Sequence, residues 1–306
     1  MNLTLACEGP LDVAATLSRY QLWGEDPANR VAGDVFHRVL RAGDALWPYE
    51  VRWRGSIEAV RLSVTVPGVR SATVGDAVSA EVRRIFGLDF DLPGFYRMAK
   101  GDPALSGLIE PLYGMRPTLS PTPLEMLVGS ITAQQINLSF AFACRARLVR
   151  RYGTRVAHRA VELWAFPDAD ALAGVTVREM LALKFSTRKA EYIRDLAREV
   201  VAGRLDLEAL RGCPSPDVIA QLTSLRGLGR WTADWFLARG CGRGDVCPAG
   251  DLAVRKAFDH YYGRGRTLSE TAIRRRARAW GSYQNLAVHY LLAGMRLTGR
   301  RVGGDS

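Results

Sequence analysis

The order of hydrophobic and polar residues predicts strands near the start of the chain. Apolar residues alternate with polar ones over residues 60–66, as on a strand with one buried face: Val60, Leu62, Val64 and Val66. Leu3 and Leu5 alternate in the same way. Residues 76–87 then follow a helical period, with Val78, Val82, Ile85 and Phe86 on one stripe and Gly87 suited to the helix end. These patterns predict a small antiparallel sheet with one or two helices.

From about residue 105 the pattern is helical almost throughout. We expect one long helix that follows the Pro-rich turn at 120–123 and stops at Gly153, and another over residues 187–203. A further helix begins at Ser215-Pro216, and residues 271–280 place Ile273, Ala277 and Trp280 on one face. The predicted class is α+β: an N-terminal α+β domain over residues 1–104, a two-lobed helical core over 105–298, and a flexible tail over 299–306.

The charge balance favours a polyanionic partner. The chain has 42 Lys and Arg residues against 31 Asp and Glu, a formal net charge of +11 at pH 7. Such an excess binds nucleic acid through the release of counterions. An Arg-rich composition without any such partner explains the same number, so charge alone does not decide.

The cysteines and histidines argue against metal chemistry. The five cysteines are scattered and odd in number, and the four histidines cluster neither with cysteines nor with carboxylates. This favours reduced thiols in a reducing compartment. The N-terminus lacks the pattern of a signal peptide, and no apolar run approaches the roughly 18 residues of a membrane span. We therefore expect a cytoplasmic monomer with no cofactor and no membrane partner.

The stretch LRGLGRWTADWF (residues 225–236) predicts two helices joined by a tight hairpin. Gly227 and Gly229 allow left-handed angles and remove Cβ atoms from an approaching surface. The amides that open the second helix then form an anion site suited to a DNA phosphate, with Arg226 and Arg230 beside it. An ordinary helix joint closed by glycine is the alternative. No Gly-Lys-Ser/Thr follows, so a nucleotide P-loop is excluded.

Four segments together resemble a known superfamily. Residues 225–233 are followed by DVCPAGDLAVRK (residues 245–256), and ITAQQIN (131–137) and STRKAEYI (186–193) lie upstream. This combination resembles the helix-hairpin-helix DNA glycosylases, and within them the bacterial 3-methyladenine DNA glycosylase II branch. The resemblance covers roughly residues 105–295. It implies an enzyme that flips a damaged base out of double-stranded DNA and excises it.

By the same resemblance, Asp251 is the catalytic carboxylate. Base excision leaves positive charge on the sugar, and an anion about 4 Å away stabilises it by on the order of 4 kcal/mol. A general-base role and a plain N-cap role are the alternatives. Lyase branches carry a lysine where this chain has Trp231, so the resemblance implies a monofunctional hydrolase without a Schiff base.

The resemblance also assigns the remaining site residues. Trp231, Trp235 and Trp280 are expected to line the base pocket, although an aromatic residue at helical spacing also fits a core. Gln134 and Gln135 open the DNA-facing turn, with Gln135 at the wedge position or, alternatively, capping a helix. Backbone carbonyls of Thr223, Leu225 and Leu228 are implied to hold a monovalent cation. Arg274, Arg275, Arg276 and Arg278 fit a solvated helix face as well as a DNA-facing cluster.

Two other functions remain open at this stage. One is a non-catalytic DNA-binding module that uses the hairpin only to grip phosphates. The other is a glycosylase of the same fold for oxidised or deaminated bases. Asp251 favours an enzyme, and the predicted tryptophan-walled pocket favours alkylated bases.

Overall fold

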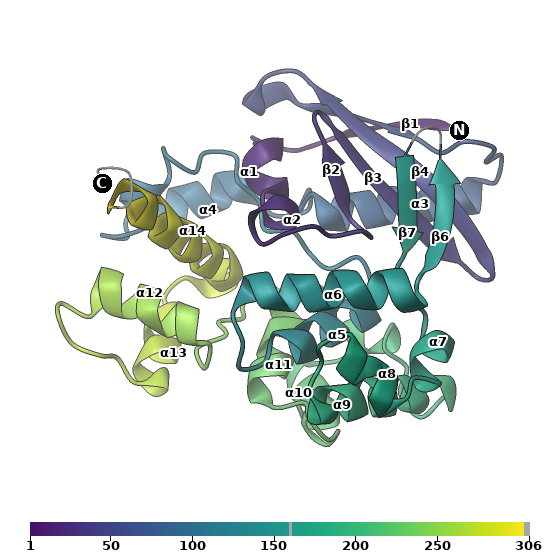
Figure 1. The fold of residues 1–306 in the computed structure, drawn as a ribbon. Coiled ribbons are helices and arrows are strands. Elements are labelled where there is room, and N and C mark those ends of the chain that lie inside the picture. Colours follow the sequence, from purple (N-terminus) through teal and green to yellow (C-terminus); the bar gives the residue numbers. More distant parts are fainter. Residues whose placement is uncertain (159–160, 303–306) are drawn as a thin grey trace.

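The computed structural model describes residues 1–158 and 161–302 (Figure 1). The N-terminal part is built on a five-stranded antiparallel sheet in the order β1-β5-β4-β3-β2. Its strands are β1 (Asn2–Ala6), β2 (Arg30–Ala32), β3 (Val35–Ala42), β4 (Ala45–Arg54) and β5 (Arg61–Thr65). Within the described ranges, no helix is both long and apolar enough to cross a membrane.

The predicted alternation is confirmed in β5. Leu62, Val64 and Val66 are fully buried, and β5 lies between β1 and β4. The helical stripe is confirmed too, because Val78, Val82, Ile85 and Phe86 are fully buried on and just after α3 (Ala72–Ile85). Two short helices, α1 (Val13–Leu17) and α2 (Arg19–Leu22), belong to the same part of the chain. The predicted small antiparallel sheet is therefore present, with α3 packed against it.

The rest of the chain is mainly helical, as predicted. The longer helices are α4 (Leu92–Ala99), α5 (Pro123–Ala133), α6 (Leu138–Tyr152), α9 (Thr187–Val201), α10 (Ser215–Thr223), α12 (Leu252–Tyr262), α13 (Glu270–Arg278) and α14 (Gln284–Val302). Shorter elements are α7 (Ala169–Ala173), α8 (Val177–Ala182) and α11 (Arg230–Trp235), the last of which continues as the π-helix η4 (Phe236–Cys241). One hydrophobic cluster joins these helices into a common core.

Two predictions for this region are wrong. The single long helix ending at Gly153 is two helices, α5 and α6, because Gln135 adopts a left-handed φ of 55° and Asn137 caps α6 by accepting from the Phe140 N–H. The region also contains a hairpin, β6 (Thr154–His158) and β7 (Val161–Ala165), whose Leu163 and Ala165 pack on Val39 of β3. In Figure 1 this hairpin lies beside the N-terminal sheet.

The packing also bears on the expected domain limits. Leu92 and Phe95 of α4 belong to the core of the helical part, although the sequence placed them before residue 104. At the other end, α14 continues to Val302 and thus includes residues 299–302 of the expected tail. Residues 303–306 lie outside the described residues.

A buried ionic network joins the two parts of the chain. Arg38 of β3 donates to Glu81 and Glu125 (Nε–Oε1 3.0 Å and Nη2–Oε2 2.9 Å). Arg145 of α6 donates to Asp26 and Glu125 (Nε–Oδ2 3.2 Å and Nη2–Oε1 2.5 Å). Burial by itself would raise the pKa of Glu125, but Arg38 and Arg145 outweigh it and hold this pKa at about 2. We call these five residues the junction network.

Candidate active site

The predicted hairpin is present between α10 and α11. Gly227 has a φ of 89°, and a Cβ atom there would lie 2.2 Å from Cγ of Tyr192. Glycine is therefore required at this position by both backbone angle and space. Gly229 has an ordinary extended φ of −104°, and an added Cβ would meet nothing within 4 Å. The fold therefore does not require glycine at 229. The space in front of this residue is open, so a binding partner could approach the backbone there.

Two side chains from upstream helices hold this hairpin. Nε2 of Gln134, at the end of α5, donates to the carbonyl oxygen of Gly227 over 2.9 Å. Nζ of Lys189 donates to the carbonyl oxygen of Thr132 over 2.8 Å and so connects α9 to the same end of α5. The segments that carry the family resemblance therefore meet at one place. Sequence reasoning did not identify the positioning role of Lys189.

Asp251 is the N-cap of α12, and its carboxylate has four hydrogen-bond donors. Oδ1 accepts from the backbone N–H groups of Ala253 (2.8 Å) and Val254 (3.1 Å). Oδ2 accepts from the indole N–H groups of Trp231 (2.7 Å) and Trp235 (3.1 Å). The N-cap alternative and the position beside the tryptophans are therefore both true of this residue. Such charge-assisted bonds hold a carboxylate in a fixed orientation.

Asp251, Trp231 and Trp235 line one cavity of about 460 Å³. Its wall is mainly apolar and includes Phe142 of α6 and Met295 of α14. A space of this size lies in the range of small-molecule and cofactor sites, so it can hold a flipped purine. The structure thus brings two of the three predicted tryptophans together with the predicted carboxylate.

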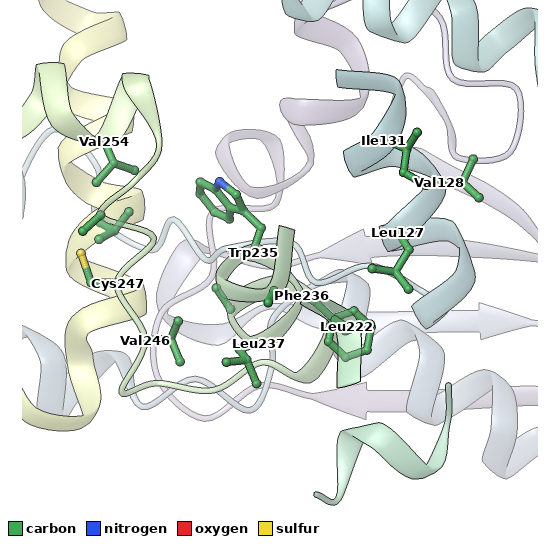
Figure 2. Close-up of a cluster of buried hydrophobic side chains, with 14 of the residues drawn as sticks. Leu127, Val128, Ile131, Leu222, Trp235, Phe236, Leu237, Val246, Cys247 and Val254 are labelled. Atoms are coloured by element: carbon green, nitrogen blue, oxygen red, sulfur yellow. The ribbon is translucent and has the colours of Figure 1, made fainter. Parts of the chain in front are cut away.

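The packing behind α11 fixes this arrangement. Phe236 and Leu237 are buried in the helical core beside Leu222 of α10 and Leu127 of α5 (Figure 2). Figure 2 shows the Trp235 ring pointing away from Phe236 and Leu237. Its other neighbour is the His289 imidazole, edge-on at a centroid distance of 5.8 Å. The core thus holds α11 and η4 in place, while Trp231 and Trp235 of α11 line the cavity.

The assignment of Trp280 to the pocket wall is wrong. This side chain is only 2% exposed and is not part of the cavity wall. Its indole N–H donates to Oδ2 of Asp102 over 2.9 Å, and its ring packs on Phe258 at 5.5 Å. The helical stripe that it shares with Ile273 and Ala277 points into the core, so the alternative reading of this tryptophan holds.

The sequence reasoning missed most of the cavity wall, including His289 of α14, Arg239 of η4 and Arg19 of α2. Nδ1 of His289 lies 2.8 Å from the carbonyl oxygen of Asn285, to which it donates. Burial, aided by Arg239, lowers the pKa of His289 to about 3, so the imidazole is neutral near pH 7. The four-residue spacing of Asn285 and His289 on one helix is only a weak sequence indication that His289 belongs to a site. For Arg19 the local sequence gives no such indication, because its helix α2 belongs to the N-terminal part of the chain.

The other predicted site residues lie around the hairpin. Arg226 pairs with Glu191 at 2.9 Å, and Arg230 pairs with Asp234 at 2.8 Å, while more than half of each arginine side chain stays exposed. Gln135 is exposed at the turn between α5 and α6.

Some of the backbone carbonyls predicted to bind a cation, and some of the clustered arginines of α13, form hydrogen bonds or ion pairs within the protein. The Leu225 carbonyl oxygen accepts from the Leu228 N–H at 3.1 Å, and Thr223 ends α10. Their cation-binding role stays a prediction. Arg274 pairs with Asp234 and Glu270, each at 2.7 Å.

No metal site emerges from the acidic, histidine or cysteine side chains. Across residues 1–158 and 161–302, no group of three or more such side chains could hold a metal ion. All five cysteines are free thiols.

Comparison with known proteins identifies relatives of this chain. Residues 128–282 match the model of the HhH-GPD superfamily of base excision DNA repair proteins. A DNA-3-methyladenine glycosylase of Bacillus subtilis is 31% identical over 206 residues, which are 67% of this chain and 68% of that protein. A solved 3-methyladenine DNA glycosylase of Archaeoglobus fulgidus superposes with a TM-score of 0.85 at 26% identity and covers 96% of this chain and 98% of that one.

A more distant structure shares the fold. It is a Clostridium acetobutylicum 8-oxoguanine glycosylase/lyase in complex with double-stranded DNA, with a TM-score of 0.75 and 18% identity over 97% of this chain and 98% of that one. The family match covers half of the chain and contains the hairpin, Trp231, Trp235 and Asp251. The chain therefore belongs to the HhH-GPD superfamily of base excision DNA repair proteins.

Proposed function

We propose that the protein is a monofunctional DNA glycosylase that flips alkylated bases of the 3-methyladenine type out of double-stranded DNA and hydrolyses their N-glycosidic bond. The single observation that carries this proposal is the Asp251 carboxylate, held by two indoles at a cavity large enough for a purine. The relatives named 3-methyladenine glycosylases support the same reaction.

Asp251 acts by charge in this proposal. As the bond to the base breaks, the sugar becomes oxocarbenium-like, and a carboxylate about 4 Å away stabilises it by on the order of 4 kcal/mol. That corresponds to roughly a thousandfold in rate. Each oxygen of Asp251 already accepts two hydrogen bonds, so few lone pairs are left to take a proton from water. This supports charge stabilisation over general-base catalysis.

The hairpin and the turn after α5 form the DNA-facing surface. The first amides of α11 follow Gly229, where no side chain blocks a phosphate, and Arg226 and Arg230 add positive charge. Gln135, exposed and left-handed at its turn, fills the space of the flipped base. Binding should weaken steeply with added salt, as phosphate contacts require, and a flat response would contradict this surface.

The absence of lyase activity rests on Trp231, which occupies the position of the lyase lysine. Borohydride trapping on abasic DNA should give no covalent complex. Lys256 of α12 also lines the cavity. If a trapped complex forms and is lost in Lys256→Met, this lysine is an amine nucleophile and the monofunctional assignment is wrong.

The deciding experiment measures free base released from duplex DNA that carries 3-methyladenine. We expect release by the wild-type protein. DNA binding without release from any of several damaged duplexes would favour the non-catalytic module. Release confined to 8-oxoguanine would favour the oxidised-base alternative.

A further inference from the structure

One helix contacts both segments that are assigned to the DNA-facing surface. In α9, Glu191 pairs with Arg226 of the hairpin at 2.9 Å, and the Tyr192 ring fills the space in which a side chain at Gly227 would lie. Lys189 of the same helix reaches the end of α5 instead, where the turn between α5 and α6 begins. The hairpin and this turn are therefore held by neighbouring residues of α9.

The carbonyl group that Lys189 contacts has no donor within its own helix. The last four carbonyl oxygens of a helix lack an intrahelical N–H partner, and that of Thr132 is among them because α5 ends at Ala133. Thr132 is only 1% exposed, so its carbonyl oxygen is shielded from water. Nζ of Lys189 supplies the missing donor over 2.8 Å. Its positive charge also suits the negative end of the α5 dipole.

The ammonium group of Lys189 occupies an unfavourable place for a charge. No carboxylate of residues 1–158 or 161–302 lies within 4.0 Å of its Nζ to form an ion pair. Burial lowers the pKa of Lys189 from its usual value, because the charged form loses water there. The bond to Thr132 is thus made at a cost to the lysine, and what it stabilises is the end of α5.

The end of α5 leads directly to the hairpin and to the exposed turn. Nε2 of Gln134, two residues after Thr132, donates to the carbonyl oxygen of Gly227 over 2.9 Å. Gln135 follows with a left-handed φ of 55° and an exposed side chain. A residue other than glycine keeps such a φ only where its surroundings hold it. The bond from Lys189 to the last turn of α5 is one of the contacts that hold it.

We propose that Lys189 is a positioning residue that fixes the Gln134–Gln135 turn relative to the hairpin, so that the grip on the phosphate and the flipping of the base are coupled. This inference rests on the proposed glycosylase function. Lys189 is not part of the cavity wall, whereas Asp251 is. Losing the lysine should therefore impair base flipping and leave the cleavage of the bond to a base already in the cavity unchanged.

The test measures single-turnover release of 3-methyladenine from two duplexes that differ only opposite the damaged base. In one duplex this base pairs with thymine, and in the other it faces an abasic analogue, so that less energy is needed to flip it. Lys189→Met keeps a long unbranched side chain but removes the donor. We expect it to slow release from the paired duplex by about tenfold and from the unpaired duplex by less than about twofold.

Two further variants control for charge and for folding. Lys189→Arg retains a cationic donor and should recover most of the rate on the paired duplex. Arg188→Met removes the neighbouring exposed charge of α9 and should leave the ratio of the two rates as in the wild type. A rate close to wild type on the unpaired duplex also shows that Lys189→Met is folded.

The outcomes separate this inference from the proposed function. Equal slowing on both duplexes by Lys189→Met, or no slowing on either, overturns the inference and leaves the glycosylase assignment intact. The same change of ratio in Arg188→Met also overturns it, since the effect would then come from charge and not from the bond to Thr132. If the wild-type protein releases 3-methyladenine from neither duplex, the proposed function itself fails, and the inference fails with it.

Discussion

Two sets of arginines in this molecule, those of the junction network and the pair Arg19 and Arg239 on the cavity wall, lie close together but differ in what surrounds them. In the junction network, Arg38 and Arg145 face Glu81, Glu125 and Asp26 at 2.5 to 3.2 Å. Elsewhere on the cavity wall, Arg19 lies over Phe142, and Arg239 donates to the carbonyl and hydroxyl oxygens of Thr118. Neither Arg19 nor Arg239 is paired with a carboxylate of the described residues, in contrast to Arg145, which also lines the cavity.

This difference predicts unequal contributions of the two sets of arginines to stability. A buried arginine with matched carboxylates holds two parts of a chain in one arrangement, and losing a partner leaves an uncompensated charge. A guanidinium without a carboxylate partner adds no ion pair to the fold, so its removal leaves no uncompensated carboxylate. The predictions below test this contrast, from the largest expected effect to the smallest.

Breaking the junction network should have the largest effect. Arg145→Met leaves Asp26 without its cation and Glu125 with Arg38 alone, and should lower the free energy of unfolding by about 3 to 5 kcal/mol in urea titrations. The control is Arg151→Met, which removes an exposed pair with Glu179 and should cost less than about 1 kcal/mol. Equal losses in the two variants would contradict the structural role of the network.

The network should also make stability depend on acid. The pKa of Glu125 is lowered from 4.5 to about 2 in the folded protein. This stabilisation is complete above pH 4.5 and is lost as the pH falls towards 2, by about 3 kcal/mol in total. Unfolding measured from pH 6 to pH 3 should show about 2 kcal/mol of this loss in the wild type and a smaller loss in Glu125→Gln. Parallel pH curves would contradict the assignment.

In the cavity, the donors to Asp251 should affect rate more than stability. Trp231→Phe keeps an aromatic ring but removes the 2.7 Å bond to Oδ2, and we expect base release to slow by about tenfold. Trp280→Phe is the matched control, since it removes an indole bond to Asp102 in the core. If both variants slow release equally, the bond from Trp231 has no special part in the reaction.

The smallest effect is expected for Arg19→Met on stability. Because Arg19 has no carboxylate partner among the described residues and methionine can still cover the Phe142 ring, the free energy of unfolding should change by less than about 1 kcal/mol. A loss as large as that of Arg145→Met would mean that Arg19 belongs to the structure and would remove the contrast between the two regions.

The sequence predicted what depends on local pattern. The alternation over residues 60–66, the stripe of α3 and the glycine hairpin concern neighbouring residues, whose periods and turn requirements are visible in one chain. The pairing of the hairpin with Asp251 was predictable only through the family resemblance. The break between α5 and α6 was missed because the left-handed angle of Gln135 has no glycine to mark it.

The rest depended on contacts between distant segments. Arg19 and His289 are 270 positions apart, yet both line the cavity, and no periodicity relates them. Trp280 was misassigned because its helical stripe fits a core and a pocket equally well. Only the packing on Phe258 and the bond to Asp102 decide between these. The β6–β7 hairpin was missed because its burial comes from Val39, more than a hundred residues upstream.

The most direct measurement is the single-turnover rate of base release by Asp251→Asn, alongside its affinity for the damaged duplex. The asparagine has nearly the same shape but carries no charge to stabilise a cationic sugar. The account predicts that release falls by about a thousandfold while DNA affinity stays within a few-fold of wild type. Release at the wild-type rate by a folded Asp251→Asn protein would contradict it.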